Sequence, residues 1–114
     1  MAAISDLIRS AHGPVPPKVD WEGRSGRHYL LASEHLGSFV MHESDLYLIA
    51  KGTHVLWVGS ASDLVDDPTS RARFRLALDC ATAAFRLDAP ADRLAAIWDL
   101  EESMPAGQAM VQAA

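Results

Sequence analysis

The stretch "DLYLIAKGTHVLWVGSASDLVDD", residues 45–67, constrains the fold of this 114-residue chain more than any other part of it. Two runs of apolar, β-branched and aromatic residues, at 45–50 and 54–59, flank a short connection that contains Gly52. Such a pattern predicts a β-hairpin. Both faces of the predicted hairpin are apolar, so another layer of structure must cover each face.

Two helices are predicted after the hairpin. The first is expected over residues 70–84, with Thr69 or Ser70 as its N-cap directly after Pro68. Its apolar residues form two stripes, which predicts a largely buried helix with Cys80 as a small core residue. The second helix is expected over 91–103, with Leu94, Ile97 and Trp98 facing inward, and a short third strand is expected near 85–88.

The region before the hairpin gives weaker patterns. Apolar residues at helical spacing predict a helix over 3–11, and the glycine and prolines of "HGPVPPK" end it. Residues 28–36 fit either a strand at 28–32 or a short helix that ends at Gly37, and we favour the strand. Trp21 is expected to anchor the preceding connector to the core, and Trp57 and Trp98 are expected to be core residues.

These elements predict an α+β fold, with a small antiparallel sheet packed against helices. The length fits a single domain. We expect an N-terminal helix and a Pro/Gly-rich connector over 1–27, a globular α+β domain over 28–104 and a flexible tail over 105–114.

Composition narrows the functional classes. The chain has 49% apolar and 22% charged residues, which is typical of a folded globular protein. No apolar run approaches the ~20 residues that cross a bilayer. The single cysteine and the start "MAAISDLIRSAHG", which lacks a basic segment, predict a cytoplasmic protein. The net charge of −5 disfavours nucleic-acid binding outside a local basic patch, such as the one formed by Arg71, Arg73 and Arg75.

The hairpin and the residues after it resemble the signature of GIY-YIG nucleases, a domain also found at the N-terminus of an excinuclease. Asp45-Leu46-Tyr47 stands where that family has Gly-Ile-Tyr. "LWVG" at 56–59 stands for its Tyr-Ile/Val-Gly motif, and "SASDL" at 60–64 for the loop that follows. The resemblance covers residues 43–103 and implies the family's third strand and metal-binding helix in "FRLDAPADRLAAIWDLEE".

The resemblance implies a specific chemistry. A tyrosine would activate water, an arginine would steady the phosphate, and a glutamate would hold a metal ion. Tyr47 fills the first tyrosine position, and Arg71 or Arg75 could supply the arginine. The metal ion would be Mg²⁺ or Mn²⁺, with a small set of acidic residues as candidate ligands: Asp99, Glu101 and Glu102.

Three positions depart from this pattern. Trp57 replaces the second tyrosine and has no hydroxyl. Asp67 stands where the arginine is expected, and Asp66 beside it adds further negative charge that repels phosphate. The glutamate position has no fixed register within residues 98–101. The sequence therefore favours a retained fold without catalysis, because function depends on an intact site rather than on the fold.

The main functional hypothesis is a non-catalytic binding protein without a cofactor, whose partner is a protein or a second copy of the chain. The alternative is a metal-dependent endonuclease that uses Tyr47, Arg71 or Arg75, and Glu101 or Glu102 on DNA. A third hypothesis is a small-anion-binding domain. Its candidate residues follow the hairpin and continue into the next helix: Ser60, Ser62, Arg71 and Arg75.

Overall fold

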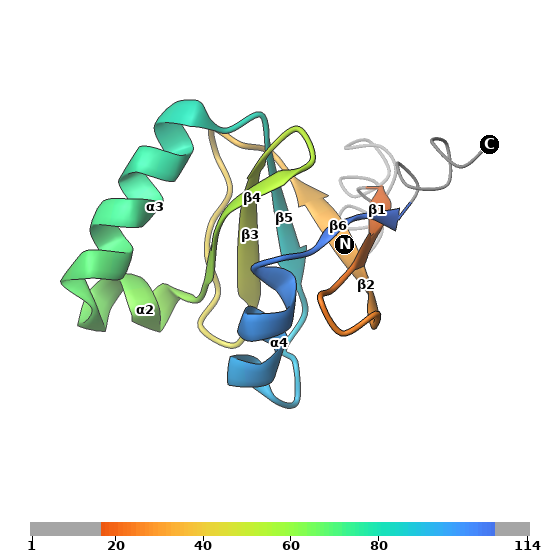
Figure 1. Ribbon diagram of the computed structural model, residues 1–114. Helices are drawn as coiled ribbons and strands as arrows, with labels where there is room; N and C mark the ends of the chain where they lie inside the picture. Colours follow the sequence, from red (N-terminus) through yellow and green to blue (C-terminus); the bar gives the residue numbers. More distant parts are fainter. Residues whose placement is uncertain (1–16, 107–114) are drawn as a thin grey trace, which may run out of the picture.

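The computed structural model of the chain describes residues 17–106 (Figure 1). The strands in this range are β1 (Lys18–Glu22), β2 (His28–Glu34), β3 (Leu46–Lys51), β4 (His54–Gly59), β5 (Ala83–Leu87) and β6 (Met104–Pro105). The helices are α2 (Ala61–Asp66), α3 (Pro68–Cys80) and α4 (Arg93–Leu100). The helix predicted over 3–11 lies outside the described residues, as does the tail from residue 107 onward.

All described strands join one antiparallel sheet with the order β4-β3-β5-β2-β1-β6. The predicted α+β class with an antiparallel sheet is confirmed, and the six-stranded sheet is larger than we predicted. Within residues 17–106, β4 and β6 are its edge strands.

The predicted hairpin is formed by β3 and β4, and β3 starts one residue later than expected. Ile49 pairs with Trp57, and Tyr47 pairs with Gly59. Gly52 lies in the connection with φ of 61°, a left-handed conformation that glycine adopts without strain. The register shifts between Ile49 and Ala50, which marks a β-bulge on the β4 side.

Residues 18–22 form β1, although we expected them to belong to a connector. Val19 and Trp21 alternate with charged neighbours, and Trp21 is fully buried against Phe85 with 5.4 Å between ring centroids. This confirms the predicted anchoring role of Trp21. The strand favoured at 28–32 is also confirmed, and β2 continues to Glu34.

Helices cover the two faces of the hairpin, as its apolar faces required (Figure 1). On one face, Leu48 and Val58 of the hairpin pack with Ala96 and Leu100 of α4. On the other face, Ile49 and Trp57 pack with Ala77 of α3. The loop between β2 and β3 adds partly buried apolar side chains to this second cluster: Leu36, Phe39 and Met41.

The helix predicted over 70–84 differs from α3 in extent and burial. α3 runs from Pro68 to Cys80, because residues 83–84 enter β5. Its N-cap is Asp67, whose carboxylate accepts hydrogen bonds from the Thr69 and Ser70 backbone N–H groups at 3.0 and 3.2 Å. Neither Thr69 nor Ser70 is the cap residue, so that prediction was wrong.

The prediction of a largely buried helix was also wrong. Ala77 is the one fully buried residue of α3. Leu76 is 67% exposed and Cys80 is exposed, so Cys80 is not a core residue. The helix contacts the sheet along one narrow side, and its alternating arginines occupy much of the remaining surface.

The second predicted helix is shorter than the expected 91–103. The Asp92 carboxylate caps α4 by accepting a hydrogen bond from the Ala95 N–H at 3.1 Å. Trp98 is 51% exposed, so its predicted core position was wrong. The Arg24 guanidinium lies 4.1 Å from the centroid of the Trp98 ring, a cation–π contact that covers part of the indole.

None of the helices within residues 17–106 is long and apolar enough to cross a membrane.

Candidate functional site

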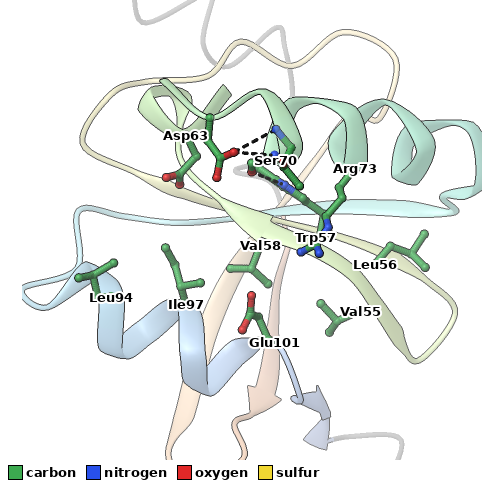
Figure 2. A pocket seen from close by; sticks show the side chains of 12 residues that line it. Val55, Leu56, Trp57, Val58, Asp63, Ser70, Arg73, Leu94, Ile97 and Glu101 are labelled. Atoms are coloured by element: carbon green, nitrogen blue, oxygen red, sulfur yellow. Dashed lines mark hydrogen bonds between the residues drawn. The ribbon is translucent and has the colours of Figure 1, made fainter. Parts of the chain in front are cut away.

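A groove runs along the edge strand β4, between α4 on one side and the α2–α3 segment on the other (Figure 2). We call it the edge groove, and its volume is ≈420 Å³. Residues 55–58 of β4 form its floor. Leu94, Ile97 and Glu101 line the α4 wall. The α2–α3 wall is more polar and consists of Asp63, Asp67, Thr69, Ser70 and Arg73.

The floor of the edge groove is held in place by Trp57. Its indole Nε1–H donates a hydrogen bond to the Ser70 hydroxyl at 3.0 Å. Its ring packs edge-on against Phe74, with 4.8 Å between the centroids. The expected core position of Trp57 is confirmed, since its exposed fraction is 6%. β4 is therefore fixed to α3 by both packing and a directional bond.

The outer edge of β4 offers backbone groups to a ligand. Among the described strands β4 pairs only with β3, so the N–H and C=O groups that point away from β3 meet no further strand. The groove lies along this edge and gives it walls formed by side chains of two helical layers (Figure 2). A recessed strand edge is suited to hydrogen bonding with an extended chain.

The groove lining carries three carboxylates and one guanidinium. Asp63 accepts hydrogen bonds from the Ser60 N–H at 2.7 Å and the Ser60 hydroxyl at 3.0 Å. Asp67 caps α3 through one of its oxygens. Glu101 is the C-cap of α4, where its charge meets the negative end of the helix dipole. The excess negative charge favours a cationic ligand.

The residues expected to catalyse hydrolysis do not all meet at this groove. Trp57 and Glu101 line it, but Tyr47 does not. Tyr47 is 1% exposed, and its hydroxyl accepts a hydrogen bond from the His42 N–H at 2.8 Å. Burial raises the pKa of the Tyr47 hydroxyl above its ordinary value, so this group remains protonated at neutral pH. Its geometry is that of an anchor for the loop before β3.

Arg71 and Arg75 also lie outside the edge groove. Both line a separate hollow on α3, together with Pro68, Ala72 and Leu76. The Arg71 guanidinium donates to the Leu64 carbonyl oxygen at 2.8 Å, which satisfies the C-terminal end of α2. The arginine that lines the groove is Arg73, the middle member of the basic patch that the sequence showed.

The two serines expected to bind an anion contact residues other than Arg71 and Arg75. Ser60 is fully buried and donates to the Asp63 carboxylate, which places negative charge at the expected anion position. Ser62 lies 3.5 Å from an Arg93 guanidinium nitrogen, a contact between α2 and the start of α4.

The acidic residues expected to bind a metal make separate contacts. Asp99 is 4% exposed and accepts hydrogen bonds from the Ser25 N–H, the Ser25 hydroxyl and the Tyr29 hydroxyl at 2.7, 2.6 and 2.7 Å. Glu102 lies 3.9 Å from the Arg24 guanidinium. Within residues 17–106, no three His, Cys, Asp or Glu side chains gather closely enough to hold a metal ion.

Several groove residues were missed from the sequence. Leu94 was expected to face inward but is 74% exposed, whereas Ile97 packs partly buried against the core as expected, and both line the groove. Asp63 was predicted only as part of the loop after the hairpin, and Arg73 only as part of a basic patch. The sequence did contain one signal for the groove. An edge strand in the predicted hairpin leaves an open surface between the helices that cover its two faces.

The chain matches no protein-family model, no curated protein and no solved structure.

Proposed function

We propose that this protein is a non-catalytic domain that binds a partner protein through the edge groove. The observation that carries the proposal is the open edge of β4 at the floor of a groove between two helical layers. An exposed strand edge is a common docking element for other chains. The apolar side chains of Leu94 and Ile97 add area that a protein segment can cover.

We also propose that residues 43–103 form a degenerate GIY-YIG-like fold. The order β3, β4, α2, α3, β5, α4 supports this, since the resemblance implies a hairpin, helical structure, a third strand and a further helix. The nuclease alternative has less support. Its tyrosine is buried and bonded to the loop backbone, and Asp67 lies on the groove wall where an arginine would be needed.

Selection from a displayed library of random linear peptides, with the full chain as bait, tests the binding proposal. We expect sequences whose binding is lost in Leu94→Asp, because Leu94 is 74% exposed and its replacement changes the groove without disturbing the core. Leu76→Asp is the matched control: Leu76 is similarly exposed but does not line the groove. The proposal fails if no peptide is selected, or if both variants bind the selected peptides equally.

Incubation of the purified chain with supercoiled and branched DNA in Mg²⁺ or Mn²⁺ tests the alternative. We expect no cleavage and no salt-dependent retention of DNA. Nicking that disappears in Tyr47→Phe would establish the nuclease and reject the non-catalytic proposal.

A further inference from the structure

We infer that the ligand of the edge groove is an extended segment of a partner protein, which adds to β4 as a further strand and in which apolar and basic residues alternate. This inference rests on the proposed binding function. It specifies the backbone conformation of the ligand and the chemistry of its side chains.

The extended conformation follows from the floor of the groove. Residues 55–58 line it, and no strand within residues 17–106 pairs with the outer side of β4. Only an extended chain can use these groups repeatedly, because the N–H and C=O groups of one strand edge are matched by those of another strand. A helix in the same place would leave the β4 groups without partners.

The alternation follows from the difference between the two walls. The α4 wall presents Leu94 and Ile97, whereas the α2–α3 wall presents Asp63 (Figure 2). Asp67 also lines the α2–α3 wall. Successive side chains of a strand point to opposite faces of the sheet. One set of ligand side chains therefore meets the apolar wall, and the other set meets the carboxylates.

Basic side chains are favoured on the side of the α2–α3 wall. This wall carries the carboxylates of Asp63 and Asp67 against the single guanidinium of Arg73. The third carboxylate of the lining, Glu101, lies on the α4 wall and adds to the negative charge of the groove. A lysine or arginine that points toward Asp63 and Asp67 reduces the repulsion between them.

A second copy of the chain fits this groove less well than a single segment. A second copy would bring its own α3 and α4 alongside β4, where the helices of the first copy already wall the edge. The bulge opposite Ile49 and Ala50 bends the edge locally, which opposes flat pairing between two sheets. The net charge of −5 on each copy adds repulsion.

The test uses the full chain labelled with ¹⁵N and a blocked hexapeptide in which valine and lysine alternate. We expect the peptide to shift the amide resonances of residues 55–59 and to slow their hydrogen exchange. A peptide of alternating valine and glutamate should bind at least about tenfold more weakly, equivalent to ~1.4 kcal/mol. Asp67→Asn, which keeps a favourable N-cap residue for α3, should weaken the lysine peptide about threefold, as expected for an exposed ion pair.

Two N-methylated forms of the lysine peptide separate strand addition from other modes of binding. One form carries methyl groups on the valine nitrogens and the other on the lysine nitrogens, so each form blocks one edge of the added strand. We expect one form to lose binding and the other to keep it. Equal binding of both forms, or loss of both, overturns strand addition.

Three further outcomes are decisive. If library-selected peptides need Leu94 but never perturb residues 55–59, the proposed function stands and the strand inference fails. Nuclear Overhauser contacts in the free protein between residues 55–59 and the segments 1–16 or 107–114 would identify the chain's own terminus as the occupant. Concentration-dependent dimerisation that Leu94→Asp abolishes would identify a second copy. Either result overturns the inference.

Discussion

The hydroxyl of Tyr29 donates a hydrogen bond of 2.7 Å to the carboxylate of Asp99 and so joins β2 to α4 across 70 positions of the sequence. Asp99 also accepts two hydrogen bonds from Ser25 in the turn between β1 and β2. The Arg24 N–H donates to the Asp99 backbone carbonyl oxygen at 3.0 Å. One buried aspartate thus fixes the β1–β2 hairpin against the helix that walls the edge groove.

We predict that Asp99→Ala lowers the free energy of unfolding by about 2–4 kcal/mol, because it removes a charged acceptor and leaves the buried Tyr29 hydroxyl without its partner. Urea unfolding followed by tryptophan fluorescence measures the change. The control is Glu102→Ala, whose exposed pair with Arg24 should contribute less than about 1 kcal/mol. Equal effects of the two variants would contradict the role given to Asp99.

The stability contributed by Asp99 should depend on pH. Burial alone would raise the pKa of this carboxyl, but the hydrogen bonds from Ser25 and Tyr29 and the charge of Arg27 outweigh burial and place the pKa below its ordinary value. A carboxyl with a lowered folded-state pKa stabilises the protein above the unfolded-state pKa of about 3.9, and this contribution is lost on acidification.

The stability difference between the wild-type chain and Asp99→Asn should therefore be constant from pH 7 to about pH 5 and shrink below about pH 4. Urea unfolding of both proteins across this range measures it. A difference that grows on acidification would show that the folded-state pKa is raised rather than lowered.

Gly23 is predicted to tolerate no side chain. A Cβ atom at this position would overlap the Asp99 carboxylate, which its hydrogen bonds hold in place. Gly23→Ala should lower the free energy of unfolding by about 1–3 kcal/mol, as for overpacking of a core. At Gly37 a Cβ would meet only the His35 ring at ordinary distance, so Gly37→Ala should change stability by less than about 0.5 kcal/mol. Thermal unfolding of both variants compares them directly.

The sequence was most informative where local chemistry alone decides the structure. The β3–β4 hairpin follows from two apolar runs around Gly52, whose positive φ is the conformation that a tight hairpin turn requires. β1 was missed, although Val19 and Trp21 alternate with charged residues. The prolines before it favoured a connector in our prediction, and a strand of five residues is stable only when it pairs with other strands, here β2 and β6.

Helix burial was harder to predict from composition. Alanine, leucine and cysteine on α3 indicated a buried helix, yet the sheet offers it one narrow contact side, and Leu76 and Cys80 remain exposed. Trp98 lies outside the core, and its ring contacts Arg24, which is distant in sequence. Such contacts depend on the packing of whole elements, which no local window of sequence contains.

The candidate site was predictable only in part. Asp67, which the sequence indicated as a negative charge after the hairpin, lines the groove. Trp57 and Glu101 share a groove, whereas the Tyr47 side chain contacts the loop before β3. This difference depends on the direction in which each side chain leaves its strand or helix. A single strand register decides this, and a shift by one residue would reverse every side chain.

Arg86 of β5 is predicted to hold three carboxylates together. Its Nε–H donates to Glu34 at 3.1 Å, one of its terminal nitrogens lies 3.6 Å from Asp45, and the same nitrogen pairs with Asp88. Asp45 is buried and accepts a hydrogen bond from the Ala89 N–H at 2.9 Å. This cluster connects the ends of β2, β3 and β5 through one side chain.

Arg86→Met should lower the free energy of unfolding by about 2–3 kcal/mol, because the buried Asp45 loses its cation while the three negative charges remain close together. Arg75→Met on the exposed side of α3 is the control and should change stability by less than about 0.5 kcal/mol. Urea unfolding at low ionic strength measures both. If the two variants are equally stable, the carboxylates do not depend on Arg86.

The last prediction concerns the bond that fixes the floor of the edge groove. Trp57→Phe and Ser70→Ala each remove the hydrogen bond between the indole N–H and the serine hydroxyl. Each should cost at least about 1 kcal/mol, and the double variant should cost less than the sum of the two by about 0.5–1.5 kcal/mol.

A double-mutant cycle in urea measures this coupling energy. Thr69→Ala combined with Trp57→Phe serves as the matched control, since Thr69 also lines the groove but has no bond to the indole among the described contacts. The two substitutions of the control should be additive to within about 0.5 kcal/mol. A coupling near zero for Trp57 and Ser70 would mean that packing against Phe74, rather than the hydrogen bond, keeps β4 in position beside α3.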